Sequence, residues 1–201
     1  MPLRWVEELV NTRNVEDGSD ELADPAALAA WFVGRGLLPA GAPVDEAGRA
    51  RAAQVREGLR ALIAANNGGE PPSPAAEGEA GSPEGAGSPD GGAAVADGVE
   101  PGALDALART APGLALVLEL GSGRPRLVPA HPGTVDGALA ALLAAVAEAV
   151  ADGSWARLKA CREPGCRWAY YDHSRNRSRA WCSMAVCGNR AKARAFRRRG
   201  R

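Results

Sequence analysis

The sequence predicts an α+β protein in which a mainly helical body with a small β-hairpin is followed by a small four-cysteine module, itself a β-hairpin plus a C-terminal helix. Three observations predict this arrangement. Apolar residues recur at helical spacing in segments of residues 1–67 and in residues 134–151. Two short apolar runs flank the turn-forming residues 121–123, which is typical of a hairpin. All four cysteines of the 201-residue chain fall within residues 161–187.

Three helices are predicted before residue 68. The first covers residues 2–13, which carry a short apolar stripe. Asp24-Pro25 is a favourable N-cap and first-turn pair, so a second helix begins there and ends near Gly34 or Gly36. A longer helix runs from about Asp45 to Asn66. Its apolar stripe consists of Val55, Leu59, Leu62 and Ile63.

Residues 68–98 interrupt the helical pattern. Of these 31 residues 14 are Gly or Pro, six are acidic and none is basic, so the segment cannot bury enough apolar surface to fold, and we predict a disordered acidic loop. After it we expect a short helix over residues 104–111. Strands over residues 114–120 and 126–130 then form the hairpin. The clearest helix of the body follows over residues 134–151.

Charge is strongly segregated along the chain. Residues 151–201 contain 14 basic and three acidic residues, a net charge of +11, while residues 1–150 carry −11. This asymmetry predicts a basic module that meets a polyanion. No apolar run is long enough to span a bilayer, and the N-terminus lacks the apolar run of a secretory signal, so we expect a cytoplasmic protein without membrane contact. No constellation of catalytic side chains is visible, so we do not expect an enzyme.

The cysteines follow the spacing C-x4-C-x15-C-x4-C, as Cys161, Cys166, Cys182 and Cys187. Two close pairs joined by a returning spacer are what a tetrahedral Zn²⁺ site with four cysteine ligands requires. Disulfides or a redox switch are the alternative reading. Residues five apart lie about 140° apart on a regular α-helix, so one such helix cannot easily present both Cys182 and Cys187. We therefore expect Cys182 just before the last helix, predicted from about Ser183 to Arg199, and Cys187 near its first turn.

Arginines gather in two places around these cysteines. Arg175, Arg177 and Arg179 lie between the cysteine pairs, and Arg190, Arg194, Arg197 and Arg198 fall on one face of the predicted last helix. Guanidinium groups in a row can contact the phosphates of a nucleic acid, and nearby tyrosines can stack on bases. A solvated charged face is the alternative. The candidate nucleic-acid-binding residues are Arg175, Arg177, Arg179, Asn189, Arg190, Lys192, Arg194, Arg197 and Arg198.

The run WCSMAVCGNRAKA, with the upstream cysteine pair and the Asp172–Arg175 element, resembles the CGNR zinc-finger family. The segment Leu9–Arg13, the helix ending in WFVGRGLL and the helix over residues 56–64 resemble the ABATE domain, which precedes such fingers in bacterial proteins described as stress-related transcription regulators. The resemblance implies an ABATE-like helical regulatory domain over residues 1–152 and a CGNR-type zinc finger with a basic C-terminal helix over residues 153–201. It also implies that the finger binds zinc and DNA.

Two functional readings result. The first is a zinc-binding, DNA-binding transcription regulator whose partner is double-stranded DNA and which forms a homodimer through its N-terminal body. The alternative is a zinc-stabilised, redox-sensitive protein-interaction module that docks on an acidic partner. The two differ in whether the basic end binds nucleic acid at low salt.

Overall fold

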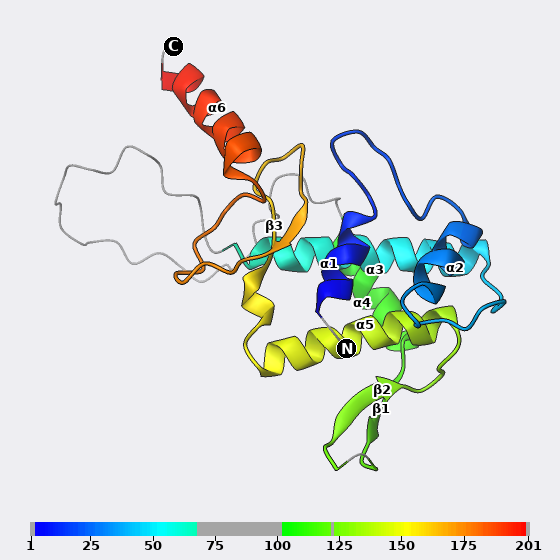
Figure 1. Cartoon of the computed structure of the whole chain (residues 1–201). Coiled ribbons are helices and arrows are strands. Elements are labelled where there is room, and N and C mark those ends of the chain that lie inside the picture. The colour runs from blue at the N-terminus through cyan, green and yellow to red at the C-terminus, as the bar shows by residue number, and fades with distance from the viewer. Residues whose placement is uncertain (1–2, 68–101, 122, 200–201) are drawn as a thin grey trace.

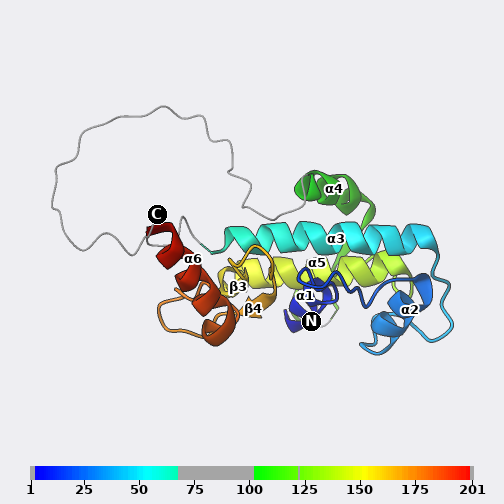
Figure 2. The same cartoon turned by 90° about the horizontal axis from the view of Figure 1, so that it is seen from above.

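The computed structural model describes residues 3–67, 102–121 and 123–199 of the chain. The acidic segment 68–98, which the sequence predicts to be disordered, lies outside the described residues. A long central helix, α3 (Glu46–Ala65), organises the body, and the other helices pack around it (Figures 1 and 2). These are α1 (Arg4–Asn11), α2 (Pro25–Val33), α4 (Ala103–Thr110) and α5 (Val135–Ala151).

Side-chain caps explain where three of the helices begin. Asp24, Asp45 and Thr134 each accept a hydrogen bond, at 2.8, 2.7 and 3.0 Å, from the backbone N–H three residues further on. A cap of this kind satisfies one of the backbone donors that a helix start leaves without a partner. In the first turn of α5, a Cβ on Gly137 would lie 2.0 Å from the carbonyl oxygen of His131, so only glycine fits there. The predicted helix starts at Asp24-Pro25 and Asp45 are confirmed.

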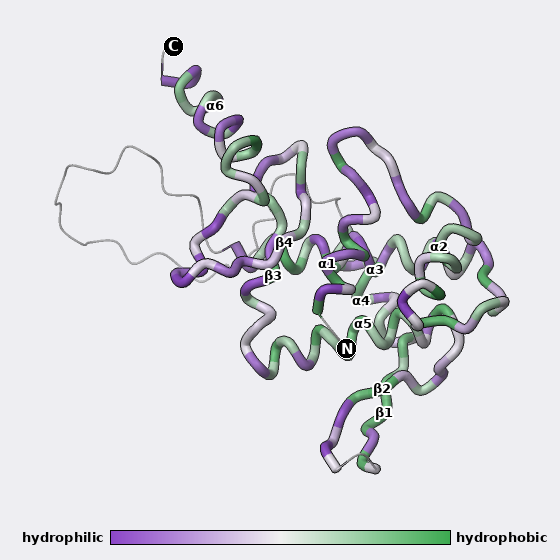
Figure 3. Tube along the Cα trace, in the orientation of Figure 1, coloured by the Kyte–Doolittle hydropathy of each residue, from purple (hydrophilic) through white to green (hydrophobic). Residues whose placement is uncertain are grey.

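The predicted hairpin of the body is also present. Strands β1 (Leu116–Glu119) and β2 (Arg126–Pro129) pair antiparallel, with Val117 opposite Val128. The hairpin touches α5 near its base and projects away from the helices (Figure 1). Figure 3 shows hydrophobic residues along β1, and Leu118 and Leu120 are exposed there. This arm therefore presents apolar surface to solvent.

A second hairpin lies against the opposite end of the body. A 3₁₀ turn over Trp155–Arg157 leads into β3 (Leu158–Ala160), which pairs antiparallel with β4 (Ala169–Tyr171). The two strands pack on α3 and α1, and Leu158, Ala160 and Ala169 are fully buried in the same hydrophobic core as the body helices. The predicted division at residues 152/153 stays a prediction, because the core runs continuously across it.

The chain ends in a π-helical turn over Met184–Gly188 that continues into α6 (Asn189–Arg199). None of the residues of α6 is buried, and the helix points outward from the second hairpin (Figure 1). Within the described ranges, no helix combines the length and the apolar character needed to cross a membrane.

Candidate metal centre and the basic surface around it

Four sulfur atoms converge beside the second hairpin. The Sγ atoms of the four cysteines all lie within 4.8 Å of one another. The Cys166 and Cys182 sulfurs are 3.6 Å apart, and the Cys182 and Cys187 sulfurs are 3.8 Å apart. A tetrahedral zinc ion with Zn–S bonds of about 2.3 Å needs sulfurs separated by about 3.8 Å. The four cysteines are thus positioned to bind one metal ion, and their donor set fits zinc.

The first cysteine pair sits on a tight turn at the end of β3. The Cys161 N–H donates to the Trp168 carbonyl at 2.8 Å, and the Cys166 N–H donates to the Glu163 carbonyl at 2.9 Å. Arg167 then adopts the left-handed conformation, with φ of 52°, and this closes the turn. The turn is built around Pro164-Gly165, a favourable turn-forming pair, and it brings both sulfurs to the same side.

The second pair is brought together by the π-helical turn. Cys182 precedes the turn and Cys187 lies within it, as the spacing predicts. The Gly188 N–H donates to the Ser183 carbonyl at 3.0 Å, a bond that spans five residues instead of four. Because this wider turn overlays residues five apart, Cys182 and Cys187 face the same point. Sequence reasoning excluded a regular helix here but did not identify the π turn.

The four neighbouring thiols shift one another's pKa values. The Cys161 thiol donates to the Cys166 sulfur, which lowers the pKa of Cys166 to about 5 and raises the pKa of Cys161. Burial raises the pKa of Cys187 to about 12. Since the thiolate is the form that binds metal, a divalent ion replaces these protons when it binds.

The loop from β4 to the second cysteine pair is organised by a buried ion pair. Lys159 Nζ lies 2.9 Å from Asp172 Oδ2, and both side chains are almost fully buried. Lys159 also donates to the Arg177 carbonyl, and Asp172 accepts from the Ser174 and Arg179 N–H groups at 2.9 and 3.1 Å. Burial alone raises the pKa of Asp172, but the hydrogen bonds from Ser174 and Lys159 outweigh it and hold the pKa well below its usual value.

Asparagine side chains fasten the cysteine module to the body. Asn11 on α1 pairs with Ala169 on β4, accepting from its N–H at 2.7 Å and donating to its carbonyl at 3.0 Å. At the end of α3, Asn66 donates to the Leu158 carbonyl at 2.9 Å and Asn67 to the Ala160 carbonyl at 2.6 Å. These contacts satisfy strand groups that would otherwise be buried without a partner. The module is therefore held in one orientation on the body.

Two acidic residues hold the start of α6. Glu163, between the first two cysteines, is buried. Its two carboxylate oxygens accept hydrogen bonds from the two terminal guanidinium nitrogens of Arg194, at 2.7 and 2.6 Å. Glu16, in the loop after α1, forms an ion pair with Arg190 at 2.9 Å. Both ion pairs direct these arginine side chains toward acidic groups of the chain itself. A phosphate that approaches these arginines competes with Glu16 and Glu163 for their guanidinium groups.

The remaining predicted nucleic-acid-binding residues differ in their surroundings. The Arg179 side chain donates to the Trp181 and Cys182 carbonyls and covers the Tyr170 ring, and the Asn189 amide donates to the Ala185 carbonyl. Both side chains therefore brace the metal centre. Five of the predicted residues are exposed and form no ion pair with another described residue, namely Arg175, Arg177, Lys192, Arg197 and Arg198.

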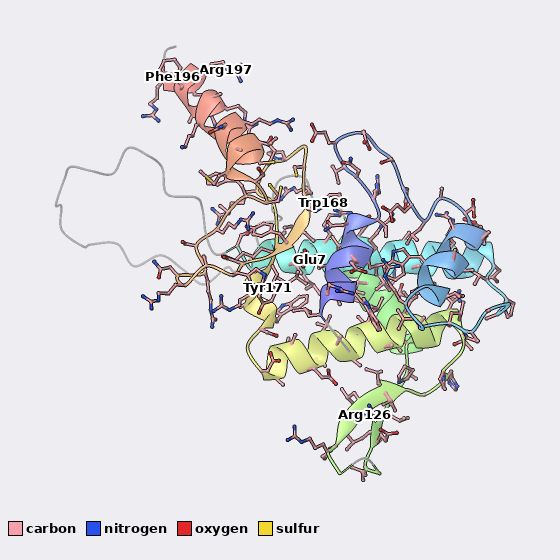
Figure 4. The ribbon with its side chains drawn as sticks, in the orientation of Figure 1. Glu7, Arg126, Trp168, Tyr171, Phe196 and Arg197 are labelled. Atoms are coloured by element: carbon pink, nitrogen blue, oxygen red, sulfur yellow. The ribbon has the colours of Figure 1, made fainter. Side chains whose placement is uncertain are left out.

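The aromatic residues near the metal centre also fall into a buried group and an exposed group. Tyr170 is buried and donates its hydroxyl to the Arg179 carbonyl at 2.6 Å, so it cannot stack on a base as its position in the sequence suggested. Trp181 packs against the cysteines, whereas Trp168 is exposed (Figure 4). Tyr171 lies beside His173, with ring centroids 4.8 Å apart.

Sequence reasoning missed the polar residues that position the centre. Lys159 and Asp172 read as ordinary charged residues, and Glu163 and Asn11 carry no local signal of their role.

The comparisons with known proteins agree with this architecture. Residues 3–153 match the ABATE family model, whose description reads "Putative stress-induced transcription regulator". Residues 157–200 match the model of the CGNR zinc finger. No curated protein matches the chain. Neither of the two matching families is a family of enzymes.

Proposed function

Because the chain belongs to the ABATE family and carries a CGNR zinc finger at its C-terminal end, we propose that it is a zinc-dependent transcription regulator that binds double-stranded DNA in the cytoplasm. The observation that carries the proposal is the convergence of four sulfurs within 4.8 Å at the base of an exposed basic helix. The metal centre shapes the surface, and the surface binds the nucleic acid.

Zinc is the ion that we assign to the four cysteines. A set of four thiolates is typical of structural zinc, and the sulfur separations suit its tetrahedral geometry. Zinc supplies folding free energy to a segment too small to have a large core of its own. Four protein ligands leave no open position on the ion, which favours a structural role over a catalytic one.

We assign the phosphate contacts to the exposed basic residues. Arg175 and Arg177 lie on the loop between the cysteine pairs, while Lys192, Arg197 and Arg198 lie on α6. Five phosphate contacts give a salt slope of about −4.5, so a fourfold rise in salt weakens binding by about 500-fold. Arg179, Arg190 and Arg194 act mainly by holding the finger in shape.

Dimerisation through the N-terminal body is part of the proposal. The hairpin exposes Val117 and Leu118 on β1 and Leu120 just after it, which supports a contact between two copies. A dimer would bring two fingers to two half-sites, which raises the affinity for DNA over that of a single finger.

The test combines metal analysis with binding to duplex DNA. We expect one zinc per chain, and we expect affinity for a random duplex library to fall steeply between low and high salt. The Arg175→Ala/Arg177→Ala variant should reduce the salt slope by about 2, while its zinc content stays unchanged. Absence of zinc, or an affinity that does not depend on salt, would refute the proposal. Zinc-loaded protein that binds neither DNA nor RNA at low salt would favour a module that docks on an acidic protein.

A further inference from the structure

The end of α6 combines a dense positive charge with one fully presented aromatic ring. Six of its eleven residues are basic and none is acidic. Phe196 is 78% exposed, more than any other large hydrophobic residue in the described part of the chain. Figure 4 shows Phe196 and Arg197 at the outer end of the helix, away from the body. At this exposure the ring contributes little to the packing of the residues that the structure describes.

The two ion pairs at the start of α6 define which side of the helix faces outward. At 3.6 residues per turn, Arg190 and Arg194 lie about 120° and 160° around the helix from Phe196. Glu16 and Glu163 therefore hold the helix by the side opposite to Phe196. Lys192 and Arg199 lie about 40° and 60° to one flank of Phe196, and Arg197 lies about 100° to the other flank, nearly in line with Arg190 but two turns further along the helix.

This arrangement suits the major groove of duplex DNA. The groove is about 12 Å wide and admits an α-helix, whereas the minor groove is only about 6 Å wide. A helix that points Phe196 at the groove floor directs Lys192 and Arg199 toward one phosphate row and Arg197 toward the other. The only apolar group on the floor of the major groove is the C5-methyl of thymine.

We propose that Phe196 is a base-reading residue that packs on the C5-methyl of a thymine in the major groove, while Lys192, Arg197 and Arg199 contact the flanking phosphates. The inference rests on the proposed DNA-binding function and adds to it a recognition residue and a base. It also changes the face of α6 that meets DNA, so that Arg199 takes the place of Arg198 among the phosphate contacts proposed above. The predicted row of Arg190, Arg194, Arg197 and Arg198 lies mostly on the side that is held by Glu16 and Glu163.

The test removes the methyl group from the DNA without changing its charge or hydrogen bonds. Duplexes are selected from a random library with the zinc-loaded full chain, and each thymine is then replaced by deoxyuridine. We expect one position at which the replacement weakens binding about three- to fivefold, the effect of removing one buried methyl group. The Phe196→Ala variant should bind the thymine and deoxyuridine duplexes equally.

Two further variants separate this role from charge and from general apolar contact. Lys192→Ala should weaken binding to both duplexes equally and reduce the salt slope by about 1. Leu118→Ala, which truncates an exposed apolar residue on β1, should keep the preference for thymine.

The outcomes distinguish the two levels of the proposal. If the wild-type chain binds duplexes in a salt-dependent way but ignores every thymine methyl, or if Phe196→Ala retains the preference, the role of Phe196 is refuted and the DNA-binding function stands. If Phe196→Ala leaves DNA binding intact and abolishes self-association, Phe196 belongs to a protein contact and the inference is likewise refuted. If the wild-type chain binds no duplex, the proposed function fails and the inference fails with it.

Discussion

Replacing Asp172 by asparagine isolates the buried ion pair that supports the metal centre. Asp172 is fully buried, and its partner Lys159 is only 3% exposed. Asparagine keeps the size of the side chain, and its single carbonyl oxygen can still accept from one of the Ser174 and Arg179 N–H groups, which bond to different oxygens of the carboxylate. It removes the negative charge, however, and leaves the Lys159 ammonium buried without a counterion.

The expected loss of stability is large. Removing one partner of a buried ion pair costs about 3–5 kcal/mol, which is a large share of the roughly 5–15 kcal/mol that stabilises a typical domain. We therefore expect Asp172→Asn to lower the free energy of unfolding by about 3–5 kcal/mol. A second substitution that removes the lysine charge, Lys159→Met, should restore part of this loss, because no unpaired charge then remains.

The dependence on pH has a defined sign. Because the pKa of Asp172 is held below its value in the unfolded chain, its stabilising contribution is complete above about pH 4 and is lost as the pH falls below that. The difference in stability between the wild type and Asp172→Asn should therefore be constant near neutral pH and shrink only in acid.

The assay is urea unfolding followed by tryptophan fluorescence with zinc in excess. Glu119→Gln is the matched control, since it breaks an ion pair with Arg126 that is exposed on the β1–β2 hairpin. We expect no measurable change for this control. If Asp172→Asn unfolds at the same urea concentration as the wild type and the control, the ion pair does not support the fold as argued.

Three other changes test separate parts of the structure. Glu163→Gln should cost about 1–3 kcal/mol and speed amide hydrogen exchange in α6, because it removes the buried carboxylate that holds Arg194. Asn11→Ala should cost about 2–4 kcal/mol in urea unfolding, because it leaves the Ala169 N–H and carbonyl without partners. Zinc affinity, measured by competition with a chelator, should fall as pH falls, since thiols such as Cys187, with a pKa near 12, must lose their protons to bind.

Controls for these changes come from the same chain. Asn14→Ala removes a partly buried asparagine whose side chain bonds to Glu16 and Asp17 of its own loop, and it should cost less stability than Asn11→Ala. Exchange in α6 that Glu163→Gln does not alter would contradict the proposed clamp. Equal stability of Asn11→Ala and Asn14→Ala would show that Asn11 does not fasten the module to the body. A zinc affinity that is the same at pH 6 and pH 8 would mean that no protons leave on binding.

Local patterns in the sequence predicted the elements well. The starts of α2 and α3 were predicted from Asp24-Pro25 and Asp45, because a capping side chain acts on a backbone N–H only three residues away. The hairpin of the body followed from two apolar runs around a glycine-rich turn. The metal centre followed from cysteine spacing, since each pair needs only a short turn to converge.

The α6 surface shows where local patterns were insufficient. Helical periodicity placed Arg190 and Arg194 correctly on one face with Arg198, but it could not show that this face meets acids of the same chain. Glu16 lies in the loop after α1, and its encounter with Arg190 depends on how the finger docks. The outward face, with Phe196, is defined only once that docking is known.

The amino-acid sequence by itself determined the helices, the two hairpins, the four-sulfur site and the concentration of positive charge at one end, because each depends on interactions between neighbours in the chain or on composition. The tertiary structure alone decided which arginines are available to a polyanion and how the cysteine module is oriented. Asn11 and Ala169, for example, are 158 residues apart in sequence and meet only in the folded chain. Contacts of this kind depend on the packing of whole elements, and no local pattern encodes them.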